Sequence, residues 1–212
     1  MRLSGRRLAA AVAVHAVLLA WPAMAAAQPR DPVGGLAIDL RAVTVSLPTT
    51  SGWTPTTLTS AAVVPSRGWG GEAGAHLIFG PGRHRRLGLG VSGLFGQGKS
   101  SSTDGSIAIT TRITAVAPHA SWNFGHRLGW SYLSGGAGLA RVTSVVDGGP
   151  TDPSGWGSAF HYGGGARWFV RERIAVSLDL RFWALTPRAA TAEQPRGAAT
   201  TRVAFGVGVA VR

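Results

Sequence analysis

The stretch IAVSLDLRF, residues Ile174–Phe182, alternates between two kinds of side chain. The large apolar members are Ile174, Val176, Leu178, Leu180 and Phe182, and the small or charged members between them are Ala175, Ser177, Asp179 and Arg181. Successive side chains of a β-strand point to opposite faces, whereas a helix would distribute these residues around its axis. The stretch therefore predicts a strand with one apolar face and one polar face.

The end of the chain repeats this alternation. The apolar residues Val203, Phe205, Val207, Val209 and Val211 alternate with Arg202, Ala204, Gly206, Gly208 and Ala210. The same period of two predicts six earlier strands, over roughly residues 33–47, 68–80, 87–97, 106–124, 129–145 and 157–170. We therefore expect eight strands that follow one another along the chain.

Two of the earlier segments change phase. In the segment 33–47 the apolar residues switch parity after Leu40, and a β-bulge near Arg41 and Ala42 would keep them all on one face. The segment 106–124 shows a similar slip between Ile113 and Val116.

The composition explains where the apolar faces could lie. Hydrophobic residues make up 45% of the chain and charged residues only 14%, against about 25% in typical soluble proteins. After Gln28 no apolar run approaches the roughly 20 residues of a membrane-spanning helix. Alternating strands can instead turn every second side chain toward lipid. The predicted fold class is therefore all-β, an eight-stranded antiparallel up-and-down transmembrane β-barrel, and without cysteine it has no disulfides.

The first 27 residues have the pattern of a secretory signal peptide. Arg2, Arg6 and Arg7 precede an apolar run over residues 8–21, and a small-residue exit predicts cleavage before Gln28. A retained membrane anchor is the alternative, but this run is shorter than the roughly 20 residues that span a bilayer. The expected organisation is thus a signal peptide over residues 1–27 and a barrel domain over residues 28–212.

The charge balance is basic. Removing the three arginines of the signal peptide from the 21 basic residues leaves 18, against 9 acidic residues. The basic residues are not gathered into one face, and an exported chain rarely meets nucleic acid. We therefore expect no nucleic-acid partner and an attraction to anionic lipid headgroups or surface polysaccharide.

The predicted connections alternate in length. Short turns cover residues 80–86, 125–128 and 171–173, and longer polar stretches cover residues 48–67, 98–105, 146–156 and 184–198. Outer-membrane barrels have short periplasmic turns and longer outer loops. Both termini are therefore expected on the periplasmic side.

Aromatic residues gather at segment ends beside the short turns. Their amphipathic rings suit the headgroup level of a bilayer and predict a periplasmic girdle. The residues assigned to this girdle are Phe79, Trp122, Phe124, Trp130, Tyr132, Trp168 and Phe169. A second group, Trp69, Trp156, Phe160 and Trp183, is expected near the other rim.

Two runs resemble a known family. GWSYLSGGAGLARV, residues Gly129–Val142, and HYGGGARWFVRERIAVSLDLRFW, residues His161–Trp183, are similar to the small outer-membrane β-barrel proteins of the OmpA/OmpX-like kind. The resemblance implies a monomer in the outer membrane of a Gram-negative bacterium, inserted by the barrel-assembly machinery and surrounded by outer-membrane lipids and lipopolysaccharide. The terminal Arg212 departs from the terminal aromatic of that family, and the cell-wall tethering of its longer members does not transfer.

The inward faces carry charges that have to be paired. With the apolar faces outward, the inward set is Asp39, Arg41, Glu72, Arg112, Arg141, Arg167, Asp179, Arg181 and Arg202. An isolated ion there would cost several kcal/mol, so these charges are expected to form a network that plugs the barrel. An ion or proton pathway is the alternative, but eight strands leave width only for side chains. The excess of arginine leaves room for an anion or water.

Signals for catalysis and for metal binding are weak. His119 and Ser121 share a strand face, which superficially looks like the site of the outer-membrane lipid A deacylases, but no carboxylate to orient the histidine follows until Asp147. The histidines His76, His84, His119, His126 and His161 are scattered singly, and the chain has no cysteine. The prediction is a protein without catalytic residues, metal or cofactor.

The leading functional hypothesis is a non-enzymatic, porin-like membrane scaffold whose outer loops meet the environment, lipopolysaccharide or a partner. Three alternatives stay open: a narrow pore for small solutes, a membrane-embedded lipid-modifying enzyme, and a soluble periplasmic lipocalin-like binder.

Overall fold

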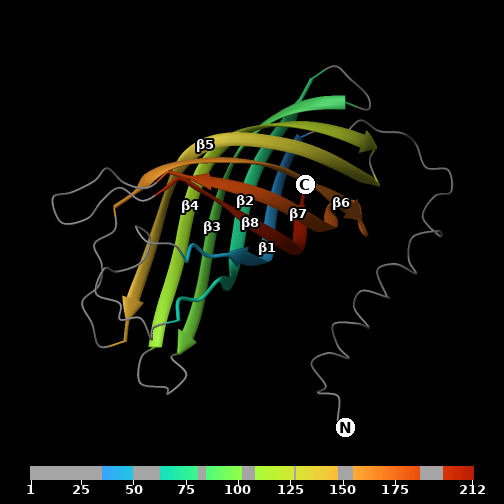
Figure 1. Ribbon diagram of the computed structural model, residues 1–212. Helices are drawn as coiled ribbons and strands as arrows, with labels where there is room; N and C mark the ends of the chain where they lie inside the picture. The colour runs from blue at the N-terminus through green and yellow to red at the C-terminus, as the bar shows by residue number, and fades with distance from the viewer. Residues whose placement is uncertain are drawn as a thin grey trace, which may run out of the picture. The chain divides into compact units, whose positions relative to one another are not determined.

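The described part of the chain forms eight β-strands (Figure 1). The computed structural model describes residues 35–49, 63–80, 85–101, 108–126, 128–147, 155–186 and 198–212, so the predicted signal peptide lies outside the described residues. The strands are β1 (Gly35–Ser46), β2 (Arg67–Phe79), β3 (Arg85–Ser101), β4 (Ala108–His126), β5 (Gly129–Val146), β6 (Gly157–Phe169), β7 (Ile174–Leu185) and β8 (Thr200–Val211). No helix among these residues is long and apolar enough to cross a membrane.

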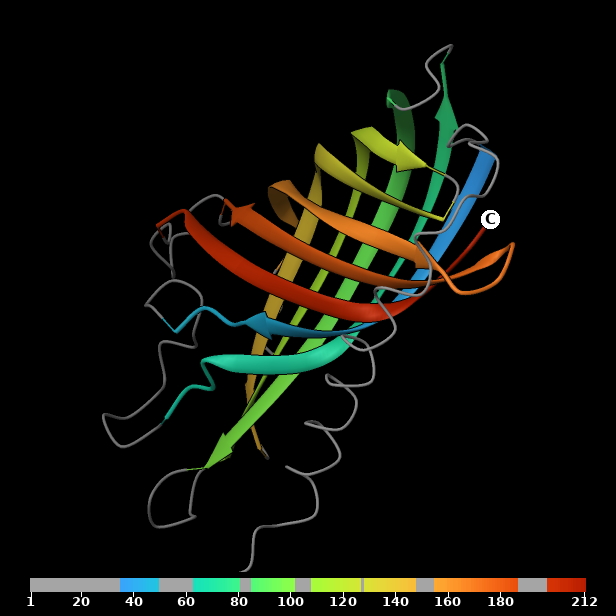
Figure 2. The same ribbon diagram turned by 90° about the vertical axis from the view of Figure 1, so that its right-hand side faces the viewer.

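Each strand pairs antiparallel with its neighbours in sequence, and β8 pairs with β1 to close a barrel, as Figure 2 shows from the side. The closure is staggered. Hydrogen-bonded partners followed around the barrel from Gly35 return to β1 at Val45, an offset of ten residues. Such a stagger tilts the strands and fixes the width of the interior. The predicted fold class is confirmed.

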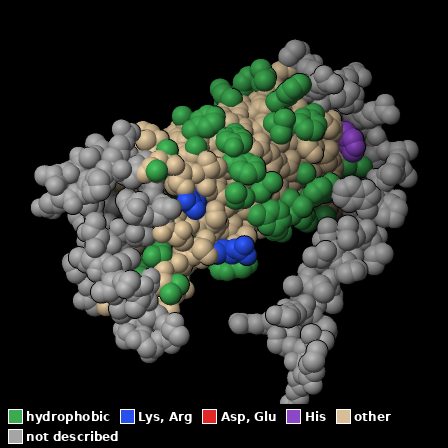
Figure 3. Space-filling view, in the orientation of Figure 1, with side chains coloured by type: hydrophobic (Ala, Val, Ile, Leu, Met, Phe, Trp, Pro, Cys, Tyr) green, Lys and Arg blue, Asp and Glu red, His purple; other side chains and the backbone are tan. Residues whose placement is uncertain are grey.

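The parity of the side chains is as predicted for β7 and β8. Phe205 and Val207 are exposed to 44% and 45% on the outer surface, whereas Asp179 and Arg181 are buried inside. Large apolar side chains are exposed on the outside of all eight strands, among them Leu40, Leu77, Leu89, Trp122, Leu133, Phe160, Leu180 and Val209. Figure 3 shows hydrophobic side chains spread over the face of the barrel that is in view. The outer surface is therefore apolar and the interior holds the polar groups.

The predicted β-bulge near Arg41 and Ala42 is wrong. The pairing of β1 with β2 runs without interruption from Gly35 to Ser46, and Val43 and Val45 are buried inside the barrel. The predicted slip in β4 is absent for the same reason, because Ile113 also points inward. The change in apolar parity therefore marks a place where the interior itself becomes apolar.

The interior has three layers. A loop-end apolar layer lies toward the longer connections and consists of Val43, Val45, Leu47, Leu94, Ile113, Ala115, Ala117, Ala140, Val142, Ala159, Trp183, Leu185 and Ala204. A turn-end apolar layer lies toward the short turns and consists of Ala37, Ile78, Trp130, Phe169, Ala175 and Ala210. Buried charged and polar side chains fill the layer between them. The polar layer is therefore enclosed at both ends by apolar side chains.

The wall is uneven in height. The strands β3, β4 and β5 have 17, 19 and 18 residues, whereas the other five have 12 or 13. They project beyond the others at the loop end, at the lower left of Figure 1. The C-terminus lies at the opposite, short-turn end, where the Arg212 amide donates to the carbonyl of Arg173 at 3.0 Å.

Gly90 leaves room for a buried ring. A Cβ atom at this inward position would lie 2.5 Å from the Ala75 carbonyl and 2.9 Å from Nε2 of His119. We expect Gly90→Ala to destabilise the barrel by about 1–3 kcal/mol through overpacking, measured by urea unfolding of the folded protein. Gly93→Ala is the control, since its Cβ would meet only the Ala115 carbonyl at 3.8 Å. Equal stability of the two variants would contradict the tight interior.

Candidate functional site

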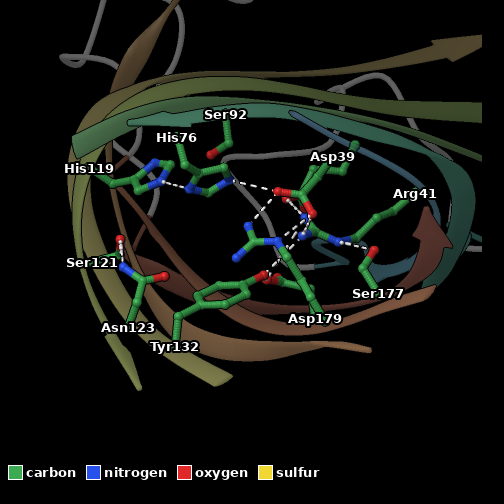
Figure 4. Close-up of polar contacts among 12 residues, drawn as sticks. Asp39, Arg41, His76, Ser92, His119, Ser121, Asn123, Tyr132, Ser177 and Asp179 are labelled. Atoms are coloured by element: carbon green, nitrogen blue, oxygen red, sulfur yellow. Dashed lines mark hydrogen bonds and ion pairs between the residues drawn. The ribbon is translucent and has the colours of Figure 1, made fainter. Parts of the chain in front are cut away.

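Six charged side chains form the centre of the polar layer (Figure 4). They are Asp39 and Arg41 of β1, Glu72 of β2, Arg167 of β6, and Asp179 and Arg181 of β7, and each is at most 2% exposed. Strands far apart in sequence contribute them because the barrel turns one face of every strand toward a common axis. Among the described residues the network holds three carboxylates and three guanidinium groups.

The carboxylate of Asp39 binds two arginines. Arg167 donates from Nε to Oδ1 at 2.9 Å and from Nη2 to Oδ2 at 2.5 Å, which is the bidentate arrangement of a strong guanidinium–carboxylate pair. Nη2 of Arg41 lies 2.7 Å from Oδ1. This corner of the network joins β1 to β6 across the barrel.

The other two carboxylates share the remaining donors. Arg41 Nη1 lies 2.9 Å and Arg181 Nη2 lies 3.2 Å from Oε1 of Glu72. Arg181 Nε donates to Oδ1 of Asp179 at 2.8 Å. Each of the three carboxylates is therefore matched by guanidinium groups within the network, and the inward residues Arg86 and Arg202 are basic groups outside it.

Tyr132 connects the halves of the network. Its hydroxyl accepts from Nη2 of Arg41 at 2.9 Å and donates to Oδ2 of Asp179. The Arg167 guanidinium lies 4.3 Å from the centroid of its ring, a cation–π geometry. The tyrosine is thus a structural member of the ionic network.

Three of the nine predicted network residues lie elsewhere. Arg112 and Arg141 are on the outward parity of β4 and β5, and Nε of Arg112 donates to the Gln97 side chain at 2.9 Å on the outside. Arg202 has inward parity but lies at the loop end, where Nη1 donates to the Leu47 carbonyl at 3.2 Å. The phase changes in the sequence concealed this, because apolar Ile113 and Val142 occupy the inward positions beside them.

The aromatic girdle is smaller than predicted. Phe79, Trp122 and Phe124 are exposed on the outside, and Trp168 has outward parity. Trp130 and Phe169, in contrast, are buried in the turn-end apolar layer with ring centroids 4.8 Å apart, and Tyr132 belongs to the ionic network. At the other rim Trp69, Trp156 and Phe160 are exposed, whereas Trp183 is fully buried.

Three histidines that are scattered in the sequence meet inside the barrel. His76 Nε2 lies 2.9 Å from Oδ2 of Asp39, and His76 Nδ1 lies 3.1 Å from Nε2 of His119 (Figure 4). The ring of His161 lies 5.5 Å from that of His119 and 4.7 Å from that of Trp183. The inward parity shared by these histidines was the sequence signal for this cluster. No group of three or more His, Cys, Asp or Glu among the described residues is arranged to hold a metal ion.

The pair His119 and Ser121 is not arranged as a nucleophile and its base. Both side chains are buried in the interior. His119 Nε2 pairs with His76, and the Ser121 hydroxyl accepts from Nδ2 of Asn123 at 2.9 Å. Both side chains therefore contact other polar side chains that fill the interior of the barrel.

A second candidate site lies on the outer wall at the loop end. A groove with a volume of about 360 Å³ is lined by Thr110, Arg112, Thr114, Arg141, Thr143, Val145 and Asp147 of the long strands β4 and β5 and the residue after β5. Two guanidinium groups and three hydroxyl groups therefore face one hollow. Nε of Arg141 is buried there without a hydrogen-bond partner among the described residues.

Further basic residues lie on the two strands that precede β4. Arg67 and Lys99 are exposed on the outward parity of β2 and β3, and Lys99 Nζ pairs with Asp147 at 2.8 Å. We refer to Arg67, Lys99, Arg112 and Arg141 as the outer basic cluster. With one acidic partner among its described neighbours, this cluster has the charge and donors for an anionic ligand.

The buried pairing makes Asp179 a test of the network. We expect Asp179→Asn to lower the free energy of unfolding by about 3–5 kcal/mol, because Arg181 would lose one of its two buried counter-ions. Asp147→Asn, in the exposed pair with Lys99, should cost at most about 1 kcal/mol. Urea unfolding measures both, and planar-bilayer recordings should show conductance for neither. Equal costs would contradict a buried network.

Comparison with known proteins identifies the fold. No family model and no curated protein sequence matches the chain. Among solved structures, Ail, the attachment invasion locus protein of Yersinia pestis, is 9% identical with a TM-score of 0.51, over 84% of this chain and 99% of its own. Neisserial surface protein A (NspA) is 12% identical with a TM-score of 0.55, over 84% and 96%. Like these outer-membrane proteins, the chain has the fold of a small eight-stranded barrel.

Proposed function

We propose that this protein is a non-enzymatic scaffold of the bacterial outer membrane, whose filled barrel spans the bilayer and whose outer basic cluster binds phosphate groups of lipopolysaccharide. The predicted outer loops include residues 50–62, 102–105, 148–154 and 187–197, which lie outside the described residues. The proposal therefore rests on the wall and the interior of the barrel.

The observation that carries the proposal is the level on the outer wall at which the outward side chains change from apolar to basic or polar. Trp69, Gln97, Arg112 and Thr143 are consecutive partners on β2 to β5 and mark this level. On the turn side the outward residues include exposed Phe95, Val116 and Leu139. On the loop side they include Arg67, Lys99 and Thr110, together with Val145. In Figure 3 blue side chains lie to the left of the largest hydrophobic area, with smaller hydrophobic patches beyond them.

The spacing between this level and the aromatic residues fits a bilayer. Arg112 lies ten residues before the exposed Trp122 along β4. A tilted strand needs about 9–11 residues to cross the hydrocarbon core, and aromatic rings favour its interfaces. Arg112 and Arg141 are then at the outer headgroup level, where the phosphates of lipid A would meet them. The short turns and both barrel termini lie on the periplasmic side.

The interior supports a scaffold in preference to a pore. The balanced ionic network lies between two apolar layers, and eight strands leave only enough width for side chains. The exposed apolar outer wall, in turn, favours a membrane barrel over a soluble periplasmic binder.

The depth of a charged substitution tests the position in the membrane. Val207 lies midway along β8 on the outer face, and Thr201 lies on the same face near the loop end. We expect Val207→Arg to destabilise the barrel in bilayers by about 2–4 kcal/mol and Thr201→Arg by at most about 1 kcal/mol. Equilibrium unfolding from lipid vesicles compares them. Equal small costs would exclude a hydrocarbon environment around Val207.

Phosphate dependence tests the outer basic cluster. We expect the double variant Arg112→Gln/Arg141→Gln to bind lipopolysaccharide roughly thirtyfold more weakly, from about 1 kcal/mol per charge near an anionic surface. Binding of enzymatically dephosphorylated lipopolysaccharide should be weak for wild type and variant alike. Surface plasmon resonance on the folded protein measures both.

The matched control removes two arginines from the opposite end. Arg171 and Arg173 are exposed beside the β6–β7 turn, and Arg171→Gln/Arg173→Gln should bind lipopolysaccharide as the wild type does. If both double variants lose affinity equally, the attraction comes from net charge and not from the outer basic cluster.

A further inference from the structure

The buried histidines occupy one rung of the barrel wall. Hydrogen-bonded partners on β2 to β7 run, in order, His76, Gly90, His119, Gly136, His161 and Trp183. All four rings are buried. Gly90 separates His76 from His119, and Gly136 separates His119 from His161. Because glycine has no side chain, each histidine ring has space above the adjacent glycine. We refer to His76, His119 and His161 as the histidine rung.

Hydrogen bonding limits how many protons the rung holds. His76 Nε2 lies 2.9 Å from Oδ2 of Asp39, and a proton on this nitrogen would leave Nδ1 of His76 able to accept from Nε2–H of His119. One added proton fits, because a doubly protonated His76 can donate from Nδ1 to His119. If both histidines are protonated, two N–H groups face each other over 3.1 Å. The hydrogen-bond geometry of the pair therefore has room for one added proton and opposes a second.

The charges around the rung oppose further protons as well. Inward ionisable groups come from every strand: Asp39 and Arg41 (β1), Glu72 (β2), Arg86 (β3), His119 (β4), Tyr132 (β5), Arg167 (β6), Asp179 and Arg181 (β7) and Arg202 (β8). The three carboxylates are already matched by Arg41, Arg167 and Arg181. A proton on the rung thus adds a positive charge without a counter-ion, which costs several kcal/mol in a buried place.

The unpaired groups near the rung are suited to an anion. Trp183 Nε1, which can only donate, is buried without a hydrogen-bond partner among the described residues, and so are both ring nitrogens of His161. A protonated His161 would add a second N–H donor beside the indole of Trp183, whose ring centroid lies 4.7 Å away. Unpaired N–H donors, together with an added positive charge, provide the contacts that a small inorganic anion needs.

We propose that the histidine rung is an acid-activated anion site, in which protonation of His119 and His161 draws a small inorganic anion such as chloride into the interior. At neutral pH the rung is uncharged and the ionic network is balanced. On acidification the interior either takes up the anion or loses stability. This site lies inside the barrel and is independent of the outer basic cluster.

The proton part is tested by the pH dependence of unfolding. Each proton that the folded interior excludes raises the unfolding equilibrium constant up to about tenfold per pH unit below about 6.5, the ordinary value for histidine. We expect the stability of the wild type to fall from pH 7 to pH 5, and to fall less steeply in His119→Gln and His161→Gln. His126→Gln, at the exposed end of β4, should keep the wild-type profile. Identical profiles in all four proteins would overturn the proposal.

The anion part is tested by exchanging the salt at constant ionic strength. At pH 5, sodium chloride should stabilise the wild type relative to sodium gluconate, whose anion is much larger than chloride. The difference should vanish at pH 8 and in His161→Gln. A chloride effect that persists unchanged in His161→Gln or at pH 8 would overturn the anion site.

Imidazole NMR of the wild type provides a test that needs no variant to fold. The signals of the histidine rung should shift at acid pH in chloride but not in gluconate, whereas the signal of exposed His126 should not depend on the anion. Titration of all described histidines alike, with no dependence on the anion, would refute the proposal.

Discussion

Closure of the sheet is the constraint on which the rest of the structure depends. Because β8 pairs with β1 at an offset of ten residues, every inward side chain enters a lumen of fixed width and every outward one faces the surroundings. A strand in an open sheet could move its misfit side chains to an edge. A closed barrel has no edge, so large, charged and aromatic groups must fit together inside.

The interior meets this constraint by separating its contents along the axis. Apolar residues occupy both ends, and the ionic groups occupy the middle. Burying six charges would be unfavourable if any were unmatched, and the equal number of carboxylates and guanidinium groups avoids this. Tyr132 shows the economy of the arrangement, since its hydroxyl bonds to one arginine and one carboxylate while its ring lies under another arginine. Neutral histidines then fill polar space without disturbing the charge balance.

The outer wall shows a second separation, also along the axis. Apolar side chains surround the barrel from the short turns to the level of Arg112, and basic and hydroxyl side chains follow on the projecting ends of β3, β4 and β5. Along the barrel axis, the inner and outer faces therefore differ in polarity at each level. At the loop end the inside is apolar and the outside polar, whereas at mid-height the inside is ionic and the outside apolar. This inversion suits a barrel whose surroundings change from hydrocarbon to headgroups.

The sequence by itself determined the eight strands, their order and the faces of β7 and β8. Residues such as Asp179 and Phe205 alternate with a period of two, and that period is a local property of an extended chain. It also determined six of the predicted network residues, because Asp39, Arg41, Glu72, Arg167, Asp179 and Arg181 lie on strands whose other face is clearly apolar.

Only the tertiary structure decided the positions where both faces of a strand are apolar. Val43 and Ile113 line the interior, so the residues beside them, including Arg112, face outward, and a bulge inferred from parity alone was wrong. Trp130 and Phe169 were likewise assigned to the wrong face. The meeting of His76, His119 and His161 depends on the stagger between strands, which sets the residues that share a rung. Stagger is a property of the closed sheet, and no single strand encodes it.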